Sequence, residues 1–92
     1  MTNTEIYFKS WCPYSQQALA LLKSKGVDYK AIDLTDDADE LELQMNERSG
    51  RTSVPQIFID GLHIGGYDDL TALDTAGELD PLLYGHEELH AA

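Results

Sequence analysis

One side chain in this 92-residue chain is a ready sulfur nucleophile, the thiol of Cys12, and it is the only cysteine present. A single cysteine excludes a disulfide within the chain and a metal site built from several cysteines of one chain. Lone cysteines are most often small buried apolar residues, so any chemistry must be argued from the surroundings. Here the surrounding segment is Lys9-Ser10-Trp11-Cys12-Pro13-Tyr14-Ser15.

That segment predicts that Cys12 stands where a strand ends and a helix begins. Residues 5–8 are apolar, β-branched and aromatic, which favours a strand. Residues 13–25 carry apolar side chains at helical spacing, begin with a proline and are followed by Gly26, a typical helix terminator. The first N–H groups of this helix, with Lys9 nearby, would favour the thiolate, which is the reactive form in disulfide exchange.

The other elements follow from alternation, helical spacing, capping residues and turn residues. We predict a strand at 27–34, followed by a helix at 38–48 that is capped by Thr35, Asp36 and Asp37 and ended by Gly50. Two strands follow at 56–59 and 62–64, joined by the Asp60-Gly61 turn. The last elements are a helix capped by Asp68 and Asp69 and one more helical turn at 79–83.

This order, β-α-β-α-β-β-α, predicts an α/β protein with a thioredoxin-like fold. The strand–helix–strand units predict two parallel crossovers, and the Asp60-Gly61 turn predicts an antiparallel last strand. The result is a four-stranded mixed sheet flanked by helices on both faces. Residues 1–84 are expected to form one domain, and residues 85–92, which are poor in apolar side chains, a mobile tail.

The net charge of the chain indicates which binding partners are unfavourable. The net charge of −11, from 17 acidic and six basic residues, argues against binding to nucleic acid or to anionic membranes. Neither a membrane span nor a signal peptide is evident, so we expect a cytoplasmic protein, and we expect it to be a monomer. Lys9, Arg48 and Arg51 are expected to gather near one site.

Three segments together resemble the glutaredoxin family, and the resemblance extends over residues 5–83. Segment 9–15 is similar to the active site of that family, whose usual form is Cys-Pro-Tyr-Cys. Segment 51–59, Arg-Thr-Ser-Val-Pro-Gln-Ile-Phe-Ile, is similar to the Thr-Val-Pro loop and the strand after it. Segment 64–70, Ile-Gly-Gly-Tyr-Asp-Asp-Leu, is similar to the Gly-Gly-x-Asp-Asp motif. The small bacterial glutaredoxins are the most similar branch.

The resemblance implies a glutathione-dependent thiol–disulfide oxidoreductase with glutathione as co-substrate. Cys12 would attack the glutathione sulfur of a mixed disulfide with a protein or small molecule, and a second glutathione would regenerate it. No metal is implied for this reaction. The residues implied to contact glutathione are Lys9, Tyr14, Ser53, Val54, Pro55, Gly66, Tyr67 and Asp68.

The implied roles of these residues differ. Pro55 is kept cis in the family, which would turn the backbone of Val54 toward the cysteinyl unit of glutathione. Asp68 and the first N–H groups of the third helix would hold the γ-glutamyl end, although Asp68 also fits a simple helix cap. Lys9 suits the glycine carboxylate, and Arg51 is either its companion or a solvated charge.

Several other residues are expected to stay outside the chemistry or to flank it. Tyr14 would flank the sulfur and pack on the ligand. Trp11 is expected to be partly exposed, and His63 to face solvent from its strand.

Two positions depart from the family pattern. Ser15 stands where the dithiol form has its second cysteine, and a hydroxyl cannot form a disulfide. Reduction of protein disulfides should therefore be impaired, while exchange with glutathionylated substrates should survive. Ser15 fits either a natural monothiol protein or a replacement of cysteine by serine. Tyr67 stands where relatives commonly have cysteine or serine.

The alternative function is a [2Fe–2S] cluster held between two chains by two cysteines and two glutathiones. Cys12 would supply the sulfur from each chain. Pro13 counts against this reading, because relatives that hold clusters usually have a more open residue there, often glycine.

Overall fold

The computed structural model describes residues 3–36 and 38–84, and within them the predicted order of elements is confirmed. The elements are β1 (Thr4–Phe8), α1 (Pro13–Ser24), β2 (Tyr29–Asp33), α2 (Asp39–Ser49), β3 (Gln56–Ile59), β4 (Leu62–Gly65), α3 (Tyr67–Thr75) and α4 (Leu79–Tyr84). The predicted tail at 85–92 and the predicted cap residue Asp37 lie outside the described residues.

The four strands form one mixed sheet in the order β2-β1-β3-β4. β1 pairs with β2 in parallel, whereas β3 is antiparallel to both β1 and β4. The mixed sheet is as predicted, but the second parallel crossover is wrong. The reason is that β2 ends at Asp33 beside Phe8, and β3 begins at Gln56 beside Tyr7, at the same end of the sheet. The connection through α2 therefore does not carry the chain back across the sheet.

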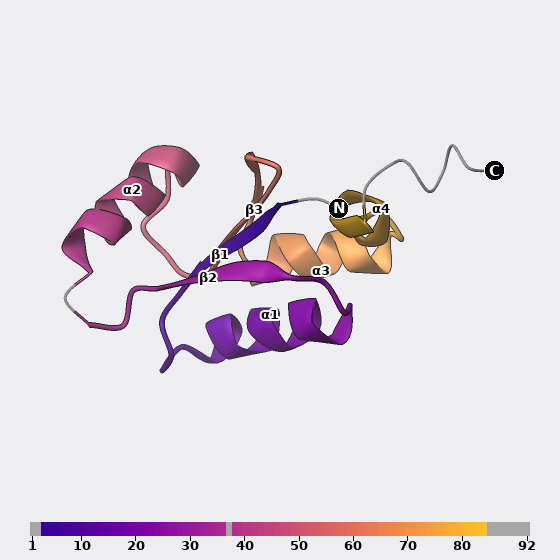
Figure 1. Ribbon diagram of the computed structural model, residues 1–92, viewed down its shortest axis with the longest axis horizontal. Coiled ribbons are helices and arrows are strands. Elements are labelled where there is room, and N and C mark those ends of the chain that lie inside the picture. Colours follow the sequence, from indigo (N-terminus) through magenta and orange to yellow (C-terminus); the bar gives the residue numbers. More distant parts are fainter. Residues whose placement is uncertain (1–2, 37, 85–92) are drawn as a thin grey trace.

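Side chains alternate between the two faces of the sheet, and each face has its own core. One core joins Ile6 and Ile57 to residues of α1, α3 and α4, and the other joins Tyr7 and Phe58 to Met45 of α2. Figure 1 shows α2 set apart from the other helices. The members of the first core are Ile6, Ala18, Leu22, Val27, Ile57, Ile59, Leu70, Leu79 and Leu83.

Arg48 ties α2 to the sheet. Its guanidinium donates to the carboxylate of Glu5 at 2.9 and 3.2 Å and to the hydroxyl of Tyr7 at 2.8 Å. It also lies 4.0 Å from the centre of the Phe58 ring, a cation–π distance. The hydrogen bond to Glu5 raises the pKa of Arg48 further. The expectation that Arg48 gathers with Lys9 and Arg51 at one site is therefore wrong, because its charge is used in this attachment.

The start of α2 also differs from the prediction. The helix begins at Asp39, and Ala38 holds the N-cap position without a side-chain hydrogen bond. Thr35 accepts the backbone N–H of Ser10 at 2.9 Å instead of capping α2, so the prediction is wrong for Thr35. Acidic residues in the first turn favour this end of the helix through its dipole.

Met45 is the only fully buried side chain of α2, and it should carry most of the apolar attachment of that helix. We expect Met45→Ala to lower the free energy of unfolding by about 2–5 kcal/mol, because it opens a cavity in the second core. The matched control is Leu43→Ala, at a side chain that is 58% exposed, with an expected change within about 0.5 kcal/mol. Urea unfolding of both variants measures the difference, and equal losses would contradict this account.

Candidate active site

Cys12 stands at the N-cap of α1, as the sequence predicts. Its backbone is extended, with φ −84° and ψ 118°, and Pro13 fills the first helical position. The carbonyl of Cys12 accepts the N–H of Gln16 at 3.0 Å, which closes the first turn. The first turn carries no acidic side chain, so the partial positive charge of the helix end acts on the sulfur without an opposing carboxylate. The sulfur of Cys12 therefore belongs to the residue at the positive end of the α1 dipole.

The sulfur lies against a loop from a distant part of the chain. Cys12 Sγ is 3.9 Å from the carbonyl oxygen of Val54, 42 residues away in sequence, and only 8% of Cys12 is exposed. The peptide bond between Val54 and Pro55 is cis, as the resemblance implies. The reactive sulfur and the proline loop are thus in direct contact.

A cavity of about 300 Å³ adjoins the sulfur through Val54, although Cys12 itself is not part of its lining. Seven of the residues implied to contact glutathione line this cavity: Tyr14, Ser53, Val54, Pro55, Gly66, Tyr67 and Asp68. Arg51, Gln56 and Asp69 complete the lining. Loop 50–55 and the start of α3 therefore meet beside α1 to form one concave site.

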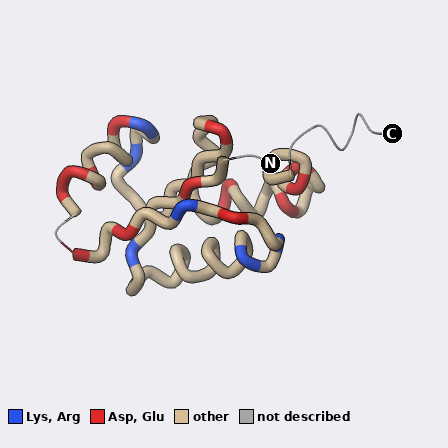
Figure 2. The backbone as a smooth tube through the Cα atoms, in the orientation of Figure 1, with Lys and Arg blue, Asp and Glu red and all other residues tan. Residues whose placement is uncertain are grey.

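Lys9 is the implied site residue that does not line this cavity. Its ammonium lies 3.8 Å from the Glu42 carboxylate and 5.7 Å from the centre of the Trp11 ring. Trp11 is 65% exposed, so this contact forms at the surface. Figure 2 shows the lysines and arginines spread along the backbone and not gathered at one place. The role implied for Lys9 stays a prediction.

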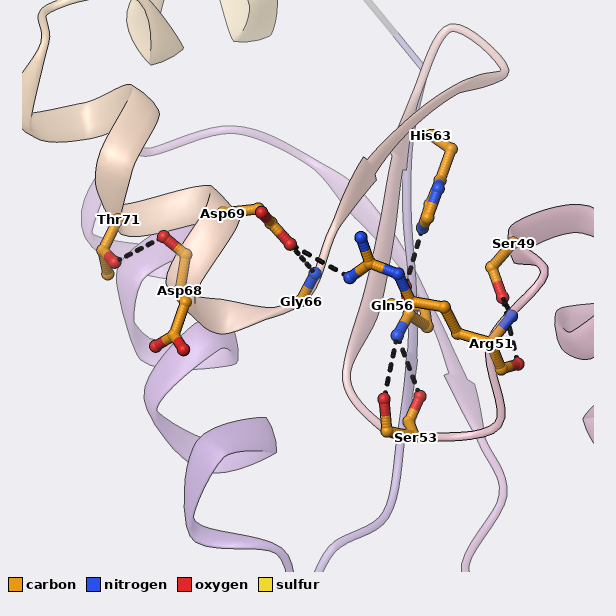
Figure 3. A network of polar contacts seen from close by, with 9 residues as sticks. All are labelled: Ser49, Arg51, Ser53, Gln56, His63, Gly66, Asp68, Asp69 and Thr71. Atoms are coloured by element: carbon orange, nitrogen blue, oxygen red, sulfur yellow. Dashed lines mark hydrogen bonds and ion pairs between the residues drawn. The ribbon is translucent and has the colours of Figure 1, made fainter.

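Asp69 organises the N-terminus of α3. Its carboxylate accepts the N–H of Gly66 at 2.9 Å and pairs with the guanidinium of Arg51 at 3.1 Å, as Figure 3 shows. These two interactions, the N–H of Gly66 first, lower the pKa of Asp69 below its ordinary value of 3.8. Gly65 makes this arrangement possible, because its φ is +122° and a Cβ there would lie 2.1 Å from the Asp69 carboxylate.

Asp68 has a different surrounding. It is exposed, and its carboxylate has no hydrogen-bond or ion-pair partner within residues 3–36 and 38–84. Figure 3 shows its carboxylate directed away from that of Asp69. The prediction that both aspartates cap α3 is therefore correct for Asp69 and wrong for Asp68. The unpaired carboxylate of Asp68 remains available to a ligand in the cavity.

The aromatic side of the cavity is a pair of tyrosines. The rings of Tyr14 and Tyr67 have their centres 6.1 Å apart with planes inclined by 33°. Tyr14 is 58% exposed, so its ring faces both the cavity and solvent. The tyrosine that departs from the family pattern thus joins α3 to α1 across the cavity rim.

Ser15 is fully buried at the third position of α1. Its hydroxyl accepts the backbone N–H of Lys9 at 3.3 Å. The position of the missing second sulfur is therefore filled by a packed, hydrogen-bonded hydroxyl.

Gln56 lines the cavity and is hydrogen-bonded to His63, and no functional role was predicted for either residue. Gln56 is fully buried, and His63 is half-buried with Nε2 2.7 Å from Gln56 Oε1. The expectation that His63 faces solvent is correct only in part, because the residue is half-buried and its ring centre lies 5.0 Å from that of Phe58. Burial, and then the charge of Arg51, lower the pKa of His63 below 6.5. The Asp60-Gly61 turn was the available signal, since a two-residue turn pairs Phe58 with His63.

Two negative findings complete the description. Within residues 3–36 and 38–84, no three or more His, Cys, Asp and Glu side chains form a group that fits a metal ion. In the same residues, none of the helices has the length and apolar character needed to cross a membrane. The alternative cluster site needs two chains and stays a prediction.

A thioredoxin-like fold with one thiol at the start of its first helix, against a cis-proline loop, defines a class of thiol–disulfide redox proteins. The comparisons with known proteins agree. The glutaredoxin family model matches residues 4–64. Glutaredoxin 3 of Escherichia coli (strain K12) is 58% identical over 83 residues, which cover 90% of this chain and 99% of that protein. The chain therefore belongs to the glutaredoxin family, and it is a thiol–disulfide oxidoreductase.

Solved structures give the same result. The solution structure of glutaredoxin from Brucella melitensis matches with a TM-score of 0.78 and 48% identity, covering 90% of this chain and 89% of that one. The crystal structure of a buckwheat glutaredoxin–glutathione complex matches with a TM-score of 0.81 and 28% identity, covering 90% and 77%. The predicted fold class is confirmed.

The contacts of Asp69 predict a stability difference between neighbouring aspartates. We expect Asp69→Ala to lower the free energy of unfolding at pH 7 by about 1 kcal/mol more than Asp68→Ala, because only Asp69 caps Gly66 and pairs with Arg51. Both variants lose a charge in the first turn of α3, so the dipole effect cancels.

The pH dependence of this difference has a definite sign. Because the pKa of Asp69 is lowered by folding, its stabilisation is complete above pH 3.8 and is lost as the pH falls through the lowered value. Denaturant unfolding of both variants across this range should show the gap closing in acid. Equal stability of the two variants at pH 7 would contradict the assigned cap.

Proposed function

We propose that this chain reduces glutathione mixed disulfides by a monothiol mechanism through Cys12. The observation that carries the proposal is the position of one sulfur at the start of α1, in contact with Val54 beside a cavity, while Ser15 fills the place of a second sulfur. This geometry supports the proposal because it combines a sulfur at the N-terminus of a helix with a concave surface and offers no internal partner for a disulfide.

The cavity offers a suitable contact for each of the three units of glutathione. The backbone of Val54, next to the sulfur, suits pairing with the cysteinyl unit in the manner of an added strand. The unpaired carboxylate of Asp68 suits the ammonium of the γ-glutamyl end, and the first N–H groups of α3 suit its carboxylate. The glycine carboxylate would take Arg51 or Lys9. A structural relative described as a glutaredoxin–glutathione complex supports this choice of ligand.

The other lining residues would shape the cavity around the ligand. Tyr14 and Tyr67, whose rings lie close together in the lining, would pack on the glutathionyl group. Pro55 and Ser53 hold Val54 in place, and Gly66 leaves room for the ligand because it has no side chain.

Two exchange steps complete the reaction. In the first, the Cys12 thiolate attacks the glutathione sulfur of the mixed disulfide; the disulfide bond breaks, and the substrate leaves as a thiolate that takes up a proton. In the second, the thiolate of another glutathione attacks the glutathione sulfur held by Cys12. Oxidised glutathione forms, and the Cys12 thiolate is the leaving group. Across the two steps, the substrate sulfur is reduced to a thiol and the sulfur of the attacking glutathione is oxidised to a disulfide, while the transferred glutathionyl sulfur stays at the disulfide level.

The cellular compartment proposed for the reaction follows from its co-substrate, glutathione. Glutathione keeps thiols reduced in the cytoplasm, so we propose that the chain acts there on glutathionylated proteins or small disulfides. One chain holds both the sulfur and the complete cavity, so a monomer is sufficient.

The decisive test follows the sulfur directly. On treatment with oxidised glutathione, the wild-type chain should gain the mass of one glutathionyl group, and it should turn over a glutathionylated thiol with reduced glutathione as reductant. Cys12→Ser should do neither, because no other sulfhydryl is present. Treatment with reduced glutathione alone is the control and should give no adduct. An unmodified, inactive wild-type chain would overturn the proposal.

The buried hydroxyl at position 15 gives a second prediction. Ser15→Cys should add reduction of intramolecular protein disulfides, because a sulfur one turn along α1 can displace the substrate from Cys12. Turnover of the glutathionylated thiol should persist in this variant. Disulfide reduction, measured with insulin as substrate, should rise well above the wild-type level. No rise, in a variant whose two thiols are shown to form a disulfide, would contradict the prediction.

A further inference from the structure

His63 makes a contact that has no part in the two exchange steps of the proposed reaction. Its Nε2 atom is 2.7 Å from Oε1 of Gln56, a residue with no exposed surface. Figure 3 shows His63 and Ser53 on opposite sides of the Gln56 amide. The amide nitrogen of Gln56 donates to the carbonyl of Ser53 at 3.0 Å and to its hydroxyl at 3.3 Å. The three residues form a continuous chain of hydrogen bonds.

The chemistry of these atoms fixes which of them carries the proton. A carbonyl oxygen only accepts, so the amide nitrogen of Gln56 must face Ser53. The amide oxygen of Gln56 then faces His63, and Nε2 of His63 must be the donor. Both this tautomer of the neutral imidazole and the imidazolium carry that proton, so the contact persists when His63 titrates.

This chain of hydrogen bonds ends at the wall of the cavity. Ser53 precedes Val54, whose carbonyl oxygen contacts the sulfur of Cys12. Within the part of the chain that the structure describes, Gln56 supplies both hydrogen bonds of Ser53. The orientation of Gln56 is fixed in turn by the single donor that His63 presents to its oxygen.

We propose that His63 is a positioning residue that fixes the Ser53–Val54 wall of the cavity through Gln56. His63 does not line that cavity, and its hydrogen bond to the cavity wall is made to Gln56, which does line it. Without its donor, the buried oxygen of Gln56 is unsatisfied, and the amide can rotate away from Ser53. Because α1 and Cys12 are not involved, the loss should fall on binding of the glutathionyl group and not on the exchange step. The inference rests on the proposed reaction.

The experiment compares two replacements of His63. His63→Leu removes the donor and keeps an apolar side chain, whereas His63→Gln offers an amide N–H to Gln56. For a glutathionylated thiol, His63→Leu should raise KM roughly three- to tenfold, the range for one hydrogen bond, with kcat within about twofold of wild type. His63→Gln should restore most of the difference in KM.

A double-mutant comparison tests whether Gln56 transmits the effect. In a Gln56→Met background, His63→Leu should cause no further rise in KM, because the hydrogen-bond chain is already broken. An undiminished effect in that background, or equal impairment by His63→Leu and His63→Gln, would overturn the inference. An inactive wild-type chain would instead overturn the proposed reaction, so the two failures are distinguishable.

A measurement on the unaltered chain covers the case in which His63→Leu does not fold. The ¹⁵N NMR shifts of the His63 ring at neutral pH should show the proton on Nε2. A proton on Nδ1 would overturn the inference without any variant, since the donor to Gln56 would then be absent.

Discussion

In an antiparallel pair the end of one strand lies opposite the start of the other, and here Tyr7, near the end of β1, pairs with Gln56, the first residue of β3. The segment after β1 and the segment before β3 must therefore lie at the same end of the strands. The first carries Cys12 and the second carries Val54, and their contact at 3.9 Å follows from this register. A parallel β3, as the element order suggested, would have placed these two segments at opposite ends.

A second constraint acts on the far wall of the cavity. β4 runs antiparallel to β3, so Gly65 and Gly66 place the start of α3 at the same end of the strands. The Asp69 carboxylate then joins the N–H of Gly66 to the guanidinium of Arg51, which ties this wall to loop 50–55. Among the residues that the structure describes, Arg51 is the only basic one that lines the cavity, and Asp69 offsets its charge. Asp68 consequently contributes an uncompensated negative charge, which favours a ligand with an ammonium group over a simple anion.

Local patterns predicted what local physics determines. The N-cap position of Cys12 followed from a proline after a strand, and the hairpin followed from Asp60-Gly61, both of which adopt positive φ in the structure. The direction of β3 did not follow, because neither helical spacing nor connection length shows whether a helix carries the chain back across a sheet. The predicted capping of α2 by Thr35 was wrong for a similar reason, since the hydroxyl of Thr35 accepts the backbone N–H of Ser10.

Side-chain partners were harder to predict than backbone positions. Arg48 was expected at the site with Lys9 and Arg51, but Glu5 and Phe58 lie within its reach on the other face of the sheet. Such pairings depend on which face a distant strand presents, which the sequence shows only after the register is known. The register of the hairpin was predictable from the Asp60-Gly61 turn, and it would have placed His63 beside Phe58 and so partly covered.

The burial of Ser15 determines what the cavity has to accomplish in the proposed reaction. A second thiol at that position would release the substrate by internal displacement, and the glutathionyl intermediate would be short-lived. The Ser15 hydroxyl accepts the N–H of Lys9 but cannot attack a disulfide, so the intermediate on Cys12 must last until another glutathione arrives. Binding must therefore hold the glutathionyl group with its sulfur open to attack. In the proposed reaction, turnover therefore depends on Val54 and on the residues that fix its position, and not on a second reactive group.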